Sequence, residues 1–326
     1  MMRRATISSV LATTWLGLAG CVVQSQPDAG KFVEAIPTAD EIKLREPVGN
    51  QLGTTPQGFE PGLTAQGGPP AGYATYYKFT RQIFDGVNLG TGYILGAVWL
   101  VVQYPPSTLS DNEAVWGPWT EALSPAEYRF RATEVAPGEF EYALEARQKN
   151  SADDFAAVLL GHGYGQQHAK HLEGTFTIDF DKANEIDPTR LDADQESGTL
   201  EVDYVLSSFP TQIDVNSNHT ATGSSFAVTV TAAQSGGGTV RVQSHDDIDD
   251  SKATAMEDVT MNSRWIASGS GRADVTIQNG DIPAGIQVLA SECWSSSFER
   301  TYWTDNASLE AQQGDVAACP YADAAY

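Results

Sequence analysis

The densest group of side chains that could do chemistry consists of His162, His168 and His171, in the segment GHGYGQQHAKH. Imidazoles are common zinc ligands, and His168 and His171 would share one face of a helix. The segment falls between two predicted strands, however, where a glycine-rich loop is expected, and no cysteine lies near it. We therefore predict a solvated loop and no metal site, and we keep a metal-dependent hydrolase that uses the three histidines as an alternative.

Two acidic runs could bind calcium, because calcium takes several carboxylate oxygens at short spacing. They are HDDIDD, with Asp246, Asp247, Asp249 and Asp250, and DADQESG, with Asp192, Asp194 and Glu196. In the second run Ser197 stands where a helix-loop-helix calcium site has glycine. The chain has 42 acidic residues, and in such a chain acidic runs are usually solvated loops. We predict no bound cofactor.

No nucleophile motif stands out in the chain. A GxSxG turn is absent from the sequence, and the glycines around Ser270 in ASGSGRAD have the wrong offsets for one. Paired catalytic carboxylates cannot be recognised among so many acids. The sequence thus yields no catalytic residue, and we expect a binding or structural module rather than an enzyme.

The first twenty residues have the pattern of an export signal. Arg3 and Arg4 give a positive start, and an apolar stretch covers residues 7–19. That stretch is shorter than the roughly 20 apolar residues of a membrane-spanning helix. The leader ends in Leu18-Ala19-Gly20-Cys21, and Cys21 is the first of only three cysteines.

This ending resembles the lipobox of bacterial lipoproteins, in which the cysteine receives fatty acyl groups such as palmitate and the chain is cut before it. The resemblance implies lipid attachment at Cys21 and a membrane-anchored place in the bacterial cell envelope. Two or more acyl chains give stable attachment. No aspartate follows at Val22 or Val23, which in Gram-negative lipoproteins favours the outer membrane. An ordinary signal peptide with a coincidental cysteine is the alternative.

The charge of the chain limits its partners. Without Arg3 and Arg4 the 19 basic residues become 17, against 42 acidic ones, so that the mature net charge is −25. A surface this negative repels phosphate backbones and anionic lipid heads. We therefore expect no nucleic acid as a partner, and contact with the membrane through the acyl chains on Cys21.

The two remaining cysteines, Cys293 and Cys319, are most simply one disulfide, since they form an even pair in an exported chain. Free thiols or a metal site are the alternatives. The chain has no CxxC pairing, which disfavours a metal.

We divide the chain into a signal peptide (1–20), a flexible tether (21–72) and a single mainly β domain (73–326). The tether range is rich in Pro, Gly, Gln and Thr. Apolar residues at three- and four-residue steps begin at Tyr73 and predict a helix. A second apolar run, GYILGAVWLVVQY, fits a helix or a buried strand and ends at Pro105. The predicted helical segment is 73–103.

Residues 127–305 change to alternating apolar and polar positions, which predict antiparallel strands with one polar face. Examples are YRFRATE, FEYALEAR, GTFTIDFD, GTLEVDYVL, SFAVTVTA, GTVRVQS and ADVTIQNG. The fold class that we predict is mainly β (α+β): an antiparallel β-meander of about ten strands with an N-terminal helical segment packed against it. The sheet would curl into an open barrel or split into a sandwich.

Several of these segments, together with WGPW and ECWSSSFERTYW, resemble patterns in exported bacterial lipoproteins of unknown function. That resemblance brings no active site. The tryptophans could stack on sugar rings, although packing around Cys293 explains Trp294 more simply. We expect a lipid-anchored envelope protein that acts as a non-enzymatic binding or structural module. A carrier of a small lipophilic ligand in an open barrel is the alternative, and the sequence names no protein partner.

Overall fold

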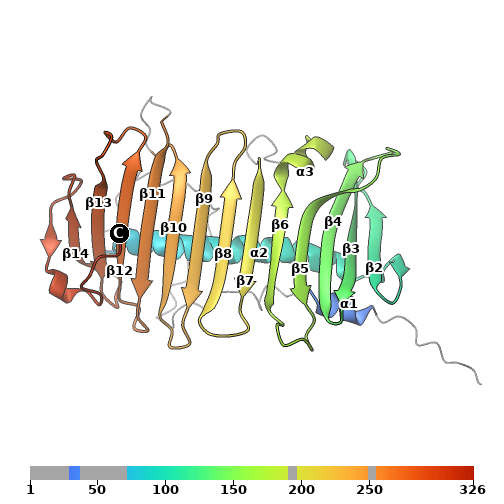
Figure 1. The fold of residues 1–326 in the computed structure, drawn as a ribbon, viewed down its shortest axis with the longest axis horizontal. Helices are drawn as coiled ribbons and strands as arrows, with labels where there is room; N and C mark the ends of the chain where they lie inside the picture. Colours follow the sequence, from blue (N-terminus) through green and yellow to red (C-terminus); the bar gives the residue numbers. More distant parts are fainter. Residues whose placement is uncertain (1–28, 37–71, 190–196, 249–254) are drawn as a thin grey trace, which may run out of the picture.

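The structure is a computed structural model that describes residues 29–36, 72–189, 197–248 and 255–326 (Figure 1). Cys21, the predicted leader, and the acidic residues Asp192, Asp194, Glu196, Asp249 and Asp250 lie outside the described residues. In the described part of the chain, no helix is long and apolar enough to cross a membrane.

Fifteen antiparallel strands form one sheet in which each strand pairs with its neighbours in the sequence. The strands are β1 (Thr108–Leu109), β2 (Glu113–Trp119), β3 (Ala126–Ala136), β4 (Glu139–Gln148), β5 (Ala156–Tyr164), β6 (Glu173–Asp179), β7 (Thr199–Val205), β8 (Thr211–Asn218), β9 (Ser225–Ala232), β10 (Gly238–Asp246), β11 (Glu257–Trp265), β12 (Gly271–Asn279), β13 (Val288–Trp294), β14 (Arg300–Asp305) and β15 (Gln313–Gly314). Beside one long helix, the described chain has three short helical turns: α1 (Gly30–Glu34), α3 (Phe180–Ile186) and η1 (Val316–Ala318).

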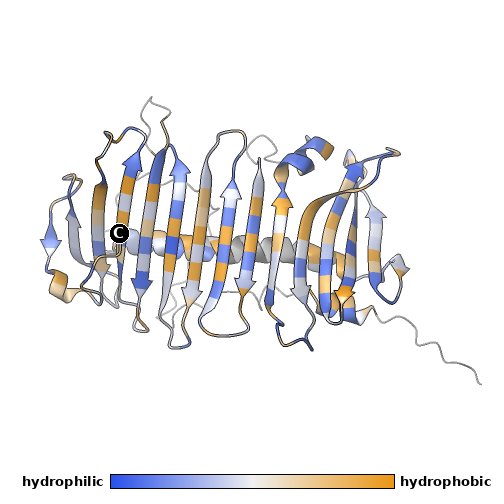
Figure 2. Cartoon of the chain, in the orientation of Figure 1, coloured by the Kyte–Doolittle hydropathy of each residue, from blue (hydrophilic) through white to orange (hydrophobic). Residues whose placement is uncertain are grey.

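The strands alternate apolar and polar side chains, as Figure 2 shows by colour. In β11 every second residue from Glu257 to Trp265 is buried, and the residues between them are partly exposed. A strand points successive side chains to opposite faces, so one face of the sheet gathers residues such as Val240, Val259 and Met261, all buried. We call this the inner face and the polar one the outer face.

A long helix, α2 (Thr75–Val102), covers the inner face and crosses the strands at a steep angle (Figure 1). Near its start Tyr77 packs on Trp294 of β13, with ring centroids 5.8 Å apart. Phe84 meets Trp265 of β11 edge to face. Just beyond its end the carbonyl of Tyr104 accepts a hydrogen bond of 2.7 Å from Trp116 of β2. The apolar run 93–102 is thus helical, and the helix reaches almost from one end of the sheet to the other.

The mainly β fold class, with a helix packed on an antiparallel meander, is confirmed. The sheet is not closed into a barrel, because β1 and β15 are its two edges and do not pair with each other. It has more strands than the ten expected. The additional strands include β5, β8 and β11, whose sequences carry Gly, Asn or Ser at many positions.

One segment inside the predicted tether is folded. Helix α1 inserts Phe32, which is 0% exposed, against Phe140 of β4, with ring centroids 5.8 Å apart. Lys31 pairs with Glu134 of β3 and donates to the carbonyl of Asp111. The tether prediction therefore does not hold for residues 29–36, because an aromatic and a cation find partners on the sheet. Residues 37–71 lie outside the described residues.

The predicted disulfide between Cys293 and Cys319 is present, with Cα atoms 5.5 Å apart. It holds the C-terminal tail on the outer face, where Arg272 donates to the carbonyls of Tyr321 and Ala322. We expected Trp294 to pack around the disulfide, and this is wrong. Trp294 follows Cys293 in a strand, so its side chain lies on the inner face against α2.

Candidate functional site

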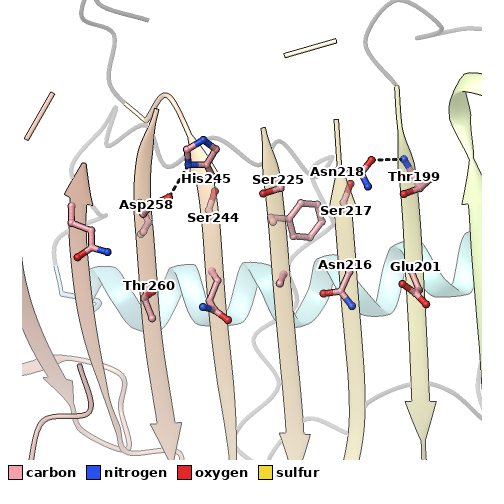
Figure 3. A pocket seen from close by; sticks show the side chains of 15 residues that line it. Thr199, Glu201, Asn216, Ser217, Asn218, Ser225, Ser244, His245, Asp258 and Thr260 are labelled. Carbon is pink, nitrogen blue, oxygen red and sulfur yellow. Dashed lines mark hydrogen bonds and ion pairs between the residues drawn. The ribbon is translucent and has the colours of Figure 1, made fainter. Parts of the chain in front are cut away.

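A shallow groove of about 550 Å³ lies on the outer face at one end of β7–β12 (Figure 3). The strand register places its side chains in two parallel rows. The first row is Thr199, Asn218, Ser225, His245, Asp258 and Gln278, and the second is Glu201, Asn216, Ala227, Gln243 and Thr260. Residues between them along the strands, such as Ser217 and Phe226, border the groove with their backbone, because their side chains point to the inner face. Six neighbouring strands therefore present one continuous set of side chains.

The chemistry of this groove is that of hydrogen bonding. Its two rows hold hydroxyl, amide and carboxylate groups, and most of these side chains are exposed or half-buried. Side-chain amides and hydroxyls both donate and accept, whereas the carboxylates of Glu201 and Asp258 only accept when ionised. Among the described residues of the two rows there is no lysine or arginine. The groove can therefore bind a ligand rich in hydrogen-bond donors.

One hydrogen bond joins two side chains at the end of the groove. Nδ1 of His245 lies 2.7 Å from Oδ1 of Asp258, directly across from it on the next strand (Figure 3). Asn279 also donates to Asp258. These hydrogen bonds, first that of Asn279 and then that of His245, hold the pKa of the Asp258 carboxyl below its usual value. Asp258 is thus an ionised acceptor at neutral pH.

The register also sets Ser225, His245 and Asp258 side by side on three neighbouring strands. This is the residue order of a Ser-His-Asp triad, and it needs a hydrogen bond from the serine to the histidine. In the described structure no hydrogen bond joins Ser225 to His245, and the three side chains stand on an open face. The arrangement is a polar row rather than an assembled catalytic site.

The three histidines named from the sequence do not converge on one point. Nε2 of His162, on β5, lies 2.8 Å from Oε1 of Glu139. The ring of His168 stacks on Tyr164, and Nδ1 of His171 lies 3.3 Å from the carbonyl of Tyr164. Within the ranges that the structure describes, no group of three His, Cys, Asp or Glu residues could hold a metal ion. The prediction that all three histidines lie in a solvated loop is also wrong in part, because His162 belongs to strand β5.

The aromatic residues considered for sugar stacking are mostly structural. Trp116, Trp294 and Trp303 are at most 3% exposed, and Trp119 stacks on Tyr128. Ser270 lies in the turn between β11 and β12, where its Oγ bonds that of Ser268. None of these residues lines the groove.

Sequence reasoning missed the groove because two of its strands were not recognised. The sequences TQIDVNSN of β8 and EDVTMNSRW of β11 hold few large apolar residues. A signal was present all the same. The outer positions of neighbouring strands in this region carry mostly Thr, Asn, Gln and Ser, with no Lys and with Glu201 as their one Glu, unlike an ordinary exposed face.

Comparisons with known proteins add no relative. No protein family, no curated protein and no solved structure matches this chain.

Proposed function

We propose that this protein is a lipid-anchored component of the bacterial cell envelope, in which the β domain is a non-enzymatic binding module. The anchor is the acylated Cys21 that the resemblance to lipoproteins implies, with the outer membrane as its location. The Cys293–Cys319 disulfide supports an exported chain, because such bonds persist in oxidising compartments.

The observation that carries the binding function is the contrast between the two faces of the sheet. The inner face packs against α2, whereas the outer face over β7–β12 leaves two rows of hydroxyl, amide and carboxylate groups open to solvent. A few placed polar groups in a concave site give orientation and specificity to a ligand. The chemical class that these groups suit best is a hydroxyl-rich ligand, such as a saccharide of the envelope.

The two alternatives receive less support from the geometry. A carrier of a lipophilic ligand needs an apolar cavity, but the groove is polar and the described part of the inner face is covered by α2. A metal-dependent hydrolase needs His162, His168 and His171 to face one ion, and they bond to different partners.

Binding is tested by titrating soluble oligosaccharides into residues 22–326, with the disulfide intact, while amide chemical shifts are followed. We expect shifts confined to β7–β12, and loss of binding in Asn216→Ala/Gln243→Ala. Thr175→Ala, on the outer face of β6 outside the groove, is the matched control. If the amide chemical shifts do not change on titration, or if they change equally in the double variant, the groove is not the binding site.

Anchoring is tested separately by metabolic labelling with a fatty acid and membrane fractionation. The wild-type chain should incorporate label and sediment with membranes, and Cys21→Ser should do neither. Retention of label by Cys21→Ser would show that the interpretation of the leader is wrong.

A further inference from the structure

We infer that the connections at one end of the strands face the lipid surface to which the chain is anchored. We call this row of connections the acid-free edge; it is distinct from the edge strands β1 and β15. This inference rests on the proposed acylation of Cys21. The acid-free edge consists of the connections β3–β4 (137–138), β5–β6 (165–172), β7–β8 (206–210), β9–β10 (233–237) and β11–β12 (266–270), which the meander brings to the same end of the strands (Figure 1).

The acid-free edge contains no Asp or Glu, although the whole chain has 42 of them. It carries Lys170 with His168 and His171. The three carboxylates at the strand ends next to these connections have partners: Glu134 pairs with Lys31, Glu139 lies 2.8 Å from His162, and Glu173 accepts a hydrogen bond of 2.6 Å from Ser207. Acids at this end are found in the outermost connections, with Asp111 in β1–β2 and Glu299 in β13–β14, and in the segments that flank the sheet, with the exposed Glu34 in α1 and Asp315 after β15.

The opposite end of the strands is acidic. Its described connections hold nine carboxylates: Glu121, Asp153, Asp154, Asp181, Glu185, Asp187, Asp247, Asp281 and Glu310. A strand of nine residues, such as β11, separates the two ends by about 30 Å. That distance exceeds the Debye length of about 8 Å at physiological ionic strength, so an anionic surface at one end acts weakly on charges at the other.

The attachment of the chain lies at the acid-free edge. Helix α1 docks beside the β3–β4 turn through Lys31 and the buried Phe32. Ala29, where the described segment begins, lies only eight residue steps after Cys21. Fully extended, eight residues span at most about 29 Å. The acid-free edge next to α1 therefore stays close to the anchored acyl chains. If α1 were not docked, the domain would be attached only through the longer segment up to Gly72, and its orientation would not be restricted in this way.

The charges decide which edge faces the lipid. An anionic surface repels carboxylates and attracts Lys, so an orientation with the acidic end outward is favoured. Exposed apolar side chains do not favour either orientation of the domain, because they occur at both ends of the strands. Phe209 and Ile266 lie at the acid-free edge, and Leu123 and Ile286 lie at the opposite end. The occupant that fits a weakly basic edge beside a lipid anchor is the lipid surface itself.

The test uses the full, acylated protein in vesicles of phosphatidylethanolamine and phosphatidylglycerol. A donor dye is placed at Ser208→Cys on the acid-free edge or at Thr222→Cys, in the loop between β8 and β9 at the other end. Because Cys21 is acylated and Cys293 is bonded to Cys319, each variant has one free thiol. Energy transfer to acceptors on the lipid headgroups should be higher from position 208. Equal transfer, or higher transfer from position 222, would overturn the inference.

A second variant tests whether docking of α1 is what holds the acid-free edge near the lipid. Phe32→Ala in the Ser208→Cys protein should undock α1 and lower the transfer, and unchanged transfer would contradict the role given to α1. Failure of the anchor is distinguishable from failure of the orientation. A chain that is not acylated and does not bind vesicles removes both proposals, whereas an acylated, vesicle-bound chain with equal transfer removes only this one.

Discussion

The carboxylate of Glu292, in β13, accepts a hydrogen bond of 2.9 Å from the backbone amide of Thr75, which lies 217 residues earlier. The amide of Tyr76 donates to the other oxygen of the same carboxylate. The residue before α2, Ala74, has no side chain that could cap the helix. Glu292 is therefore the N-terminal cap of α2, placed there by the sheet.

The cap gives a stability prediction for Glu292→Gln. The carboxylate is 0% exposed and also accepts a hydrogen bond of 2.5 Å from Arg300. A glutamine amide would bring an N–H group against one of these donors and leave the guanidinium without its buried partner, so we expect a loss of about 2–3 kcal/mol in the free energy of unfolding. Glu310→Gln is the matched control.

Glu310 also pairs with Arg300, but its side chain is 48% exposed. An exposed pair contributes at most about 1 kcal/mol. Urea denaturation of both variants checks the difference. A loss in Glu310→Gln as large as that in Glu292→Gln would show that Arg300, and not the helix cap, is the group that matters.

The same carboxylate predicts a pH dependence. Burial raises the pKa of Glu292, and the hydrogen bonds from Tyr76, Arg300 and Thr75 only partly oppose this. Between the unfolded and folded pKa values the native state then binds more protons than the unfolded state, so this group lowers stability as the pH rises through that window. The stability of wild type minus that of Glu292→Gln should thus fall as the pH is raised from about 4.5, the reference value for Glu. A difference that rises with pH would contradict the pKa direction.

A pair of glycines in β5 tests the packing of the inner face. A Cβ on Gly161 would lie 1.8 Å from Cε2 of Tyr142, which is buried, whereas a Cβ on Gly163 would meet nothing closer than 3.5 Å. Gly161→Ala should therefore cost about 3 kcal/mol or more through overpacking. Gly163→Ala should be neutral or slightly stabilising, because alanine loses less backbone entropy on folding. Thermal unfolding of the two variants checks this, and equal midpoints would exclude the clash.

The disulfide gives a prediction on the tail. Cys293 and Cys319 are 26 residues apart in the sequence, and closing a loop of that size stabilises by about 3 kcal/mol in the chain-entropy description. Cys293→Ser/Cys319→Ser should lose about that amount. Because the tail covers Arg272 and Asp274, which are at most 3% exposed, it should also become open to a carboxypeptidase. A tail that remains protected in the double variant would show that hydrogen bonds such as that from Arg272 to Ala322 hold it without the disulfide.

Periodicity made the fold class accessible from the sequence. Helix α2 could be predicted from the three- and four-residue steps that begin at Tyr73, and strands such as β7 from the alternation of Leu200, Val202 and Tyr204. The strands β8 and β11 were missed because their inner-face residues include serine and their outer-face residues asparagine, which are not typical of strands.

The groove and the helix cap depend on long-range register, which sequence patterns do not contain. His245 and Asp258 are 13 residues apart, and whether they lie opposite each other depends on the β10–β11 pairing. The cap joins residues more than 200 positions apart. Conversely, the histidine cluster that looked most like a site is dispersed, because His162 is part of a strand and His168 part of the following loop.

The order of the strands bears on how far apart in the sequence the parts of this fold lie. Each strand pairs with the next in the sequence, so the hairpins are local and need little loop closure, whereas α2 packs on β11 and β13, far along the chain. The helix precedes the whole sheet in the sequence, and Tyr104, just beyond its end, bonds to Trp116 of β2. The cap of its first turn comes from β13, the strand that carries Glu292. The helix therefore ties the beginning of the domain to its last long strands, so that removal of the strands from β13 onward would leave the first turn of α2 without its cap.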